Sequence, residues 1–228
     1  MPKKTKATKI TDSNKAWNKK SKSSSYRVET IPINKTILIV CEGQTEELYF
    51  QSFPVLGMKV TAINLGGQSK LKLVETTKEI IKNSDEEYDE TWCVFDMDVK
   101  HGETEYSDFD NSINKAKQLG YKVAYSNDSF ELWFYLHYNY TETQNLRGFY
   151  YQELSKVFGI SYEKDGKKYE FCLNLYNTLI ENTSSSQGSA IERAQKLYQK
   201  FKHLPYHKQN PVTTVFKLVV ELNKNLRK

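Results

Sequence analysis

The chain has 228 residues, of which 38% are hydrophobic and 27% charged, and its formal net charge is +5. This length and apolar fraction suit one substantial core, and no apolar run approaches the roughly 20 residues that a membrane span needs, so a membrane protein is not expected. No apolar segment follows the first lysines, so no signal peptide is expected. The cysteines Cys41, Cys93 and Cys172 lack metal-type spacing, and we expect reduced core thiols in a cytoplasmic protein.

The positive charge is concentrated at the start of the chain. Residues 1–30 contain nine Lys and Arg residues, among them Lys19, Lys20 and Lys22, against two acidic residues, a net charge of +7. The rest of the chain therefore has a net charge of −2 within the total of +5. We expect this segment to be disordered on its own. Two explanations stay open: an arm that binds the phosphates of nucleic acid, or a solubilising leader without a specific partner.

From residue 36 onward, short apolar runs alternate with segments of helical periodicity. The run 37–41 is continuously apolar, which is typical of a strand covered on both faces. Asp128-Ser-Phe-Glu131 has the spacing of a capping box that opens a helix. The order predicts an open, mostly parallel α/β sheet of about four strands with helices on both faces. In chain order we expect a strand at 37–41, a helix at 44–53, a strand at 60–65, a helix at 69–83, a strand at 91–95, a helix at 111–119, a strand at 121–125 and a helix at 128–137.

The stretch from about residue 140 to 186 has a different pattern and is expected to be a mainly helical insertion. Asp165-Gly166, between two polar and aromatic segments, favours a small hairpin at 162–171. The remaining expectations are helices at 146–158 and 173–180, a flexible link at 183–188, and closing helices at 191–201 and 212–226, the last with Pro211 in its first turn.

Two pairs of carboxylates follow predicted strands, Glu42 with Glu46 and Asp96 with Asp98. In a parallel α/β sheet, ligands bind outside the carboxyl ends of the strands, so the two pairs are expected to converge. Carboxylates that share a small volume need cations to neutralise them, and oxygen ligands suit a hard divalent ion such as Mg²⁺ or Mn²⁺. Each pair alone has an ordinary explanation, as helix-dipole acids or as a strand exit. Their joint occurrence favours a site.

Other candidates keep two explanations each. Glu131 is either part of the site or the capping partner of Asp128. The turn 66–70, which ends in Lys70, either binds phosphate or is a plain tight turn. The segments 147–151 and 162–169 either clamp single-stranded nucleic acid or attach the insertion to the core. Residues 200–208 form a further basic patch with the same two explanations, and no zinc-type His spacing, Walker A loop or GxSxG motif occurs.

Four segments together resemble the RloB family, and they occur in order from about residue 34 to 226. The segments are Ile39-Val-Cys-Glu42-Gly43-x-Thr45-Glu46-x-x-Tyr49-Phe50, Val94-Phe95-Asp96-x-Asp98, Ser126-Asn127-x-x-Phe130-Glu131-Leu132-Trp133-x-x-Leu136-His137 and Asn210-Pro211-x-Thr213-x-Val215.

The resemblance implies a Toprim-like domain over residues 31–228, with the insertion at about 140–186. The first two motifs are similar to those of OLD-family nucleases, which also carry Glu-Gly-x-x-Glu and Asp-x-Asp. It further implies a divalent metal, phosphodiester chemistry, defence against phage or foreign DNA, and an AAA/ABC-type ATPase as partner. The chain departs from the family at Asp128, where a proline is common. The basic tail is not explained by the resemblance.

Our first hypothesis is a Mg²⁺- or Mn²⁺-dependent nuclease that cleaves DNA or RNA in anti-phage or abortive-infection defence. Glu46, Asp96 and Asp98 would hold metal, Glu42 would be a metal ligand or the general base, and Glu131 would complete or orient the site. Lys19, Lys20, Lys22 and Lys70 are the residues expected to contact nucleic acid.

The second hypothesis is a non-catalytic module that binds nucleic acid or the ATPase and holds a structural cation. A third is another Toprim reaction, such as strand cleavage with religation or primer synthesis. Religation, as in a topoisomerase, would need a nucleophilic tyrosine, and the 16 tyrosines of the chain offer no way to choose one. Substrate, trigger and oligomeric state, including a homo-oligomer, stay open.

Overall fold

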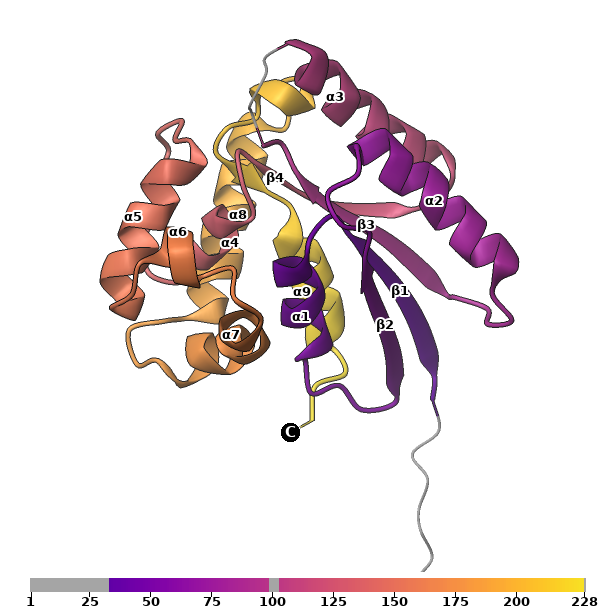
Figure 1. Cartoon of the computed structure of the whole chain (residues 1–228), viewed down its shortest axis with the longest axis horizontal. Coiled ribbons are helices and arrows are strands. Elements are labelled where there is room, and N and C mark those ends of the chain that lie inside the picture. Colours follow the sequence, from indigo (N-terminus) through magenta and orange to yellow (C-terminus); the bar gives the residue numbers. More distant parts are fainter. Residues whose placement is uncertain (1–32, 99–102, 228) are drawn as a thin grey trace, which may run out of the picture. The chain divides into compact units, whose positions relative to one another are not determined.

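The computed structural model describes residues 33–98 and 103–227. Within them, one sheet of five strands has the order β2-β1-β3-β4-β5 (Figure 1). The first four strands run parallel, and the last is antiparallel to its neighbour. The predicted open, mostly parallel sheet is thereby confirmed, with one short strand more than expected. The strands are β1 (Lys35–Cys41), β2 (Met58–Asn64), β3 (Glu90–Asp96), β4 (Lys122–Asn127) and β5 (Val212–Thr213).

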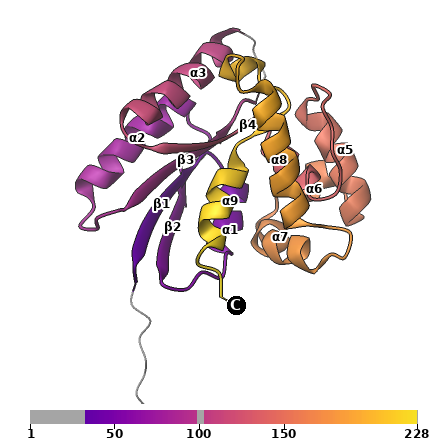
Figure 2. The same cartoon turned by 180° about the vertical axis from the view of Figure 1, so that it is seen from behind.

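Both faces of the sheet are covered, as the continuous apolar runs predict. In β1, Ile37, Ile39 and Cys41 enter one buried cluster, whereas Leu38 and Val40 enter the other. This alternation follows from the two-residue period of a strand. Figures 1 and 2 show helices α1 (Gln44–Gln51) and α9 (Val215–Asn223) on the first face, and α2 (Lys70–Asn83) and α3 (Glu103–Gln118) on the second.

The insertion is helical throughout its described elements and belongs to the first cluster. Its buried side chains, such as Tyr150, Tyr162 and Leu175, share that cluster with Tyr49 of α1. It is therefore part of the same core as the sheet. The remaining helices are α4 (Glu131–Tyr135), α5 (Arg147–Phe158), α6 (Tyr162–Asp165), α7 (Tyr169–Glu181), α8 (Gln187–Phe201) and the short 3₁₀ helix η3 (Tyr206–Lys208).

The hairpin expected at 162–171 is wrong. The segment forms α6 and the start of α7, and Gly166 has a right-handed helical conformation and donates its N–H to the Tyr162 carbonyl over 2.8 Å. A Cβ on Gly166 would lie 2.6 Å from that carbonyl oxygen. The glycine is therefore needed for close approach to a buried tyrosine and does not mark a hairpin turn.

The capping box expected at 128–131 is also wrong. Helix α4 has Phe130 at its N-cap and no side-chain cap. The Asp128 carboxylate instead accepts a hydrogen bond from the backbone N–H of Arg147 over 2.9 Å, and Glu131 pairs with Lys167. Both side chains find partners in the insertion, which local spacing could not show.

The closing segment differs from the expected helix at 212–226. Pro211 precedes β5, which pairs with β4, and α9 begins only at Val215. Thr214 secures this arrangement, because its hydroxyl accepts from the N–H of Tyr125 over 2.9 Å. Two other boundaries also moved: α3 begins at Glu103, before the expected 111, and Ser186 caps α8 inside the expected flexible link.

The described residues contain no helix that is long and apolar enough to cross a membrane. Cys41, Cys93 and Cys172 are free and buried, which confirms them as core thiols. Burial raises the pKa of the Cys93 thiol to about 12 and that of the Cys41 thiol well above its ordinary value.

Candidate functional site

The two acid pairs lie where the chain changes direction across the sheet. From β1 the chain passes through α1 to β2 on one side, and α2 on the opposite face then leads back across β1 to β3. β1 and β3 are neighbours, with Cys41 paired to Val94, so Glu42 and Asp96 follow adjacent strand ends. In open α/β sheets such a switch point, outside the carboxyl ends of the strands, is where ligands bind.

One cavity at this edge, of about 480 Å³, is lined by Glu42, Glu46, Asp96 and Asp98. The structure thus brings both acid pairs to one space. The same cavity is lined by two cations of the insertion, and the residues that complete it are Gly43, Gln44, Thr45, Asn64, Gly66, Gly67, Arg147 and Lys167.

Glu46 is held in the cavity by the sharp entry into α1. Gly43 is the N-cap, and a Cβ there would lie 2.9 Å from the Oε2 atom of Glu46. Glu46 is only 7% exposed. Burial and the charges of Glu131 and Glu42, opposed by the ammonium of Lys167, together raise the pKa of its carboxyl to about 7.

Asp96 and Asp98 are fixed by the backbone around β4. The N–H of Phe130 donates to Asp96 Oδ2 over 3.1 Å, and the N–H of Asp98 donates to the carbonyl of Asp128 over 2.9 Å. Asp98 has a φ of 47°, in the left-handed region that few non-glycine residues adopt. Burial, together with the charges of Glu42 and Glu46, raises the pKa of the Asp96 carboxyl well above its ordinary value.

Two cations, Arg147 and Lys70, pair with these acids. Arg147 Nη2 contacts Asp98 Oδ1 and lies 4.0 Å from Asp96 Oδ2. Lys70 Nζ lies 3.8 Å from Glu42 Oε1. Over residues 33–98 and 103–227, no group of three or more His, Cys, Asp or Glu side chains is gathered closely enough to hold a metal ion. In this arrangement the protein's own cations offset part of the negative charge of the acids.

Glu131 does not line the cavity. Its side chain is 1% exposed and pairs with the ammonium of Lys167, which does line it. Glu131 therefore influences the site by positioning Lys167 and by its charge on Glu46 and Asp96. The cavity-lining cations Arg147 and Lys167 were not among the site residues expected from the sequence, although both lie in the segments considered as a nucleic-acid clamp.

The glycine turn before α2 binds a side chain of the protein. The N–H groups of Lys70 and Leu71 donate to the carboxylate of Asp108, over 3.1 and 3.4 Å. These amides are thus occupied, and the side chain of Lys70, 8% exposed, turns toward Glu42. The other three lysines expected to contact nucleic acid, Lys19, Lys20 and Lys22, lie outside the described residues.

The tyrosines of the insertion mostly belong to the core. Tyr150 and Tyr162 are fully buried, so they cannot stack on a base. In the basic patch at 200–208, Lys200 pairs with Glu142 over 2.5 Å, and Nδ1 of His207 lies 2.7 Å from Oδ2 of Asp110.

A comparison with protein-family models agrees with the resemblance of these motifs to RloB. The family model described as RloB-like protein matches residues 37–222, which is most of the chain. The chain belongs to the RloB-like family. This match spans both acid pairs and the insertion that supplies Arg147 and Lys167, so the cavity of this RloB-like chain lies within the family region. No curated protein and no solved structure matches the chain.

Proposed function

We propose that this RloB-like chain is a nuclease that uses Mg²⁺ or Mn²⁺ to hydrolyse phosphodiester bonds in DNA or RNA. The observation that carries the proposal is the meeting of Glu42, Glu46, Asp96 and Asp98 in one cavity at the switch point of the sheet. A purely structural role does not explain why Glu42, Glu46 and Asp96, whose charges repel one another, share one edge of the sheet.

The donor set fits such an ion. All four side chains offer carboxylate oxygens, which hard divalent cations prefer. The raised pKa values of Glu46 and Asp96 reflect burial and repulsion between acids, and added positive charge would relieve that repulsion. Glu46, Asp96 and Asp98 would hold the ion, with Glu42 as a further ligand. A bound divalent ion polarises phosphate and makes water a stronger nucleophile near neutral pH.

The chain's own residues supply the other parts. Arg147, with its fixed fork of donors, would suit a bidentate contact to phosphate oxygens. Lys70 places a positive charge beside Glu42, the carboxylate that would take a proton from water. Lys167, anchored by Glu131, holds positive charge beside Glu46.

The direct test is a cleavage assay on plasmid DNA, single-stranded DNA and tRNA, with Mg²⁺, Mn²⁺ or a chelator. Wild type is compared with Asp98→Ala and with the control Asp85→Ala, an exposed acid in the turn before β3. We expect cleavage that the chelator abolishes, a loss of roughly 100-fold or more in Asp98→Ala, and no change in Asp85→Ala. Cleavage by Asp98→Ala at the wild-type rate would refute the proposal.

A role in defence against phage, together with an AAA/ABC-type ATPase, is the second part of the proposal and is supported by the family resemblance. The assay is therefore run with and without the ATPase. If no substrate is cut with any divalent metal, even when the ATPase is present, the nuclease proposal fails.

One observation favours a second candidate, a non-catalytic module that binds nucleic acid or the ATPase. Arg147, Lys70 and Lys167 already offset part of the acidic charge, and the described part of the chain has no ready three-ligand cluster. This candidate predicts that Asp98→Ala and Glu42→Ala keep full defence in cells, whereas deletion of residues 1–30 abolishes it. The nuclease proposal predicts that both substitutions abolish defence.

A further inference from the structure

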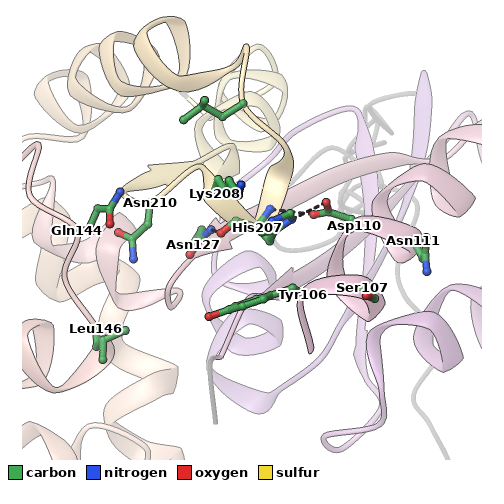
Figure 3. A pocket seen from close by; sticks show the side chains of 11 residues that line it. Tyr106, Ser107, Asp110, Asn111, Asn127, Gln144, Leu146, His207, Lys208 and Asn210 are labelled. Atoms are coloured by element: carbon green, nitrogen blue, oxygen red, sulfur yellow. Dashed lines mark hydrogen bonds and ion pairs between the residues drawn. The ribbon is translucent and has the colours of Figure 1, made fainter. Parts of the chain in front are cut away.

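A second, larger cavity lies beside the carboxylate cavity and has a different chemistry. Its volume is about 1110 Å³, and α3, the end of β4, the loop before α5 and η3 contribute to its wall (Figure 3). Its described lining consists of amides, an aromatic pair, two leucines and a few other polar groups, with a single carboxylate among them. The lining residues are Tyr106, Ser107, Asp110, Asn111, Asn127, Gln144, Leu146, Leu204, His207, Lys208 and Asn210.

An aromatic pair forms one side of this cavity. The rings of Tyr106 and His207 stack, with centroids 5.3 Å apart and planes tilted by 22°. Asp110 holds His207 through two hydrogen bonds. Its carboxylate accepts one from the backbone N–H of His207 over 2.8 Å and one from Nδ1 of the ring over 2.7 Å. Among the described residues, Nε2 of this imidazole has no hydrogen-bond partner. The pair is thus a preorganised flat surface with a free polar edge.

The opposite side offers amides and one apolar side chain. Asn210 donates to the carbonyl of Asn145 over 3.1 Å, while its buried Oδ1 has no partner within the described part of the chain. Gln144 and Leu146 are exposed, the latter by 59%. Figure 3 shows the hydroxyl end of Tyr106 pointing toward the side where Leu146 and Asn210 lie.

This combination fits a nucleobase. Bases stack on aromatic faces, contact apolar side chains, and pair their edges with amide donors and acceptors. The exposed Lys208 at the same cavity offers a cation for a backbone phosphate. The exposed amide of Gln144 at the same cavity can pair with the edge of a base.

The two cavities are close enough for one strand to enter both. Leu146 lines the larger cavity, and the next residue, Arg147, lines the carboxylate cavity. Likewise Asn127 lines the larger cavity, and the carbonyl of Asp128 accepts from the N–H of Asp98 over 2.9 Å. Consecutive Cα atoms are only about 3.8 Å apart, so a base and a neighbouring phosphate can lie in adjacent spaces.

We propose that the larger cavity binds one unstacked base of a single-stranded nucleic acid, with a neighbouring phosphate directed to the carboxylate cavity. A base inside a closed duplex cannot reach such a space without being extruded. This inference deepens the proposed nuclease function, because it identifies the substrate as a single strand, a loop or an overhang.

The test measures binding separately from cleavage. In the full chain carrying Asp98→Ala, fluorescence anisotropy compares labelled single-stranded DNA and RNA with a blunt duplex of the same length, at moderate and high salt. Tyr106→Leu removes the stacking surface, and His207→Gln removes the imidazole. Tyr88→Leu is the matched control, because Tyr88 lies before β3 at the opposite end of the sheet.

We expect Tyr106→Leu and His207→Gln to weaken binding of single strands by about ten-fold, and Tyr88→Leu to leave it unchanged. Duplex binding, which the basic residues of the chain provide through phosphates, should be equal in all variants. Thermal melting confirms that each variant folds. If both cavity variants bind single strands as tightly as the control, or lose single-strand and duplex binding equally, the inference is overturned.

The outcomes also separate the two proposals. If wild type cuts no nucleic acid with any divalent metal while Tyr106→Leu still loses single-strand binding, the nuclease proposal fails and the base site stands. If wild type cleaves and Tyr106→Leu binds and cleaves single strands like the control, the base site alone fails.

Discussion

Replacing Glu46, a proposed metal ligand, by Gln should make the protein more stable at alkaline pH. Glu46 is 7% exposed, and burial, followed by the charges of Glu131 and Glu42, raises the pKa of its carboxyl from 4.5 to about 7. The difference between these values, at about 1.36 kcal/mol per pKa unit, corresponds to about 3 kcal/mol.

The sign follows from proton linkage. Because the folded-state pKa is raised, the folded protein holds a proton that the unfolded chain has already lost between pH 4.5 and about 7. The stability that Glu46 contributes is therefore fully present below pH 4.5 and is lost as the pH rises through about 7. Between pH 5 and 8.5, wild type should lose about 2–3 kcal/mol that Glu46→Gln does not lose.

The assay is urea denaturation at pH 5 and 8.5 in the presence of a chelator, with the exposed Glu75→Gln on α2 as the control. In thermal melts the difference corresponds to roughly 4–12 °C for a chain of this size. Adding Mg²⁺ at pH 8.5 should stabilise wild type and the control, but Glu46→Gln much less. If the stability of Glu46→Gln and of wild type depends on pH equally, the reasoning is refuted, since ionising the carboxyl of Glu46 would then cost the folded protein no free energy.

Three further changes have defined outcomes. Gly43→Ala would place a Cβ 2.9 Å from the carboxylate of Glu46, so the rate in a cleavage assay should fall by about 100-fold. The melting temperature should change no more than in the control Gly148→Ala, where the added Cβ meets open space. Burial lowers the pKa of His137 to about 4, so the stability that the neutral imidazole contributes is lost as the pH falls from 6.5. Between pH 7 and 4.5, the free energy of unfolding from urea denaturation should therefore fall by about 2–3 kcal/mol less in His137→Asn than in wild type. Lys167→Met leaves Glu131, 1% exposed, without its cation, which should cost about 2–4 kcal/mol; a double-mutant cycle with Glu131→Gln should recover most of it.

The parallel sheet and the strand-end acids could be predicted because both depend on local patterns. The run from Ile37 to Cys41 is apolar at every position because alternate residues enter different clusters on the two faces of the sheet. Gly43 marks the sharp turn into α1, and Glu46 lies one helical turn further on. Since parallel strands end at one edge, knowing two strand ends was enough to bring two acid pairs together.

The cations of the site could not be predicted in the same way. Lys167 and Glu131 are 36 residues apart, and Arg147 reaches Asp98 from the insertion. No periodicity connects such positions. The need to neutralise several buried acids predicts that cations are near, but it does not identify which lysine or arginine the fold brings to them.

Local signals failed where contacts distant in the sequence decided the outcome. Val212 and Thr213 were expected to begin the closing helix. The free edge of β4 instead supplies their backbone partners, and the hydroxyl of Thr214 accepts a hydrogen bond from Tyr125. Asp165-Gly166 resembles a hairpin turn, but packing of Tyr162 into the core favours helix.

The insertion is part of the site itself. Thr45, next to Glu46 on α1, lies 3.5 Å from the sulfur of Cys172 on α7, and Tyr49 packs against Tyr176 of the same helix. The helix that carries one acid is thus held by the insertion, whose segments also supply Arg147 and Lys167. Removing the insertion would uncover apolar side chains of α1 and take away two of the cations that offset the charge of the acids. The site therefore depends on the insertion for both its packing and its charge, which is why strand-end motifs alone describe only its acidic half.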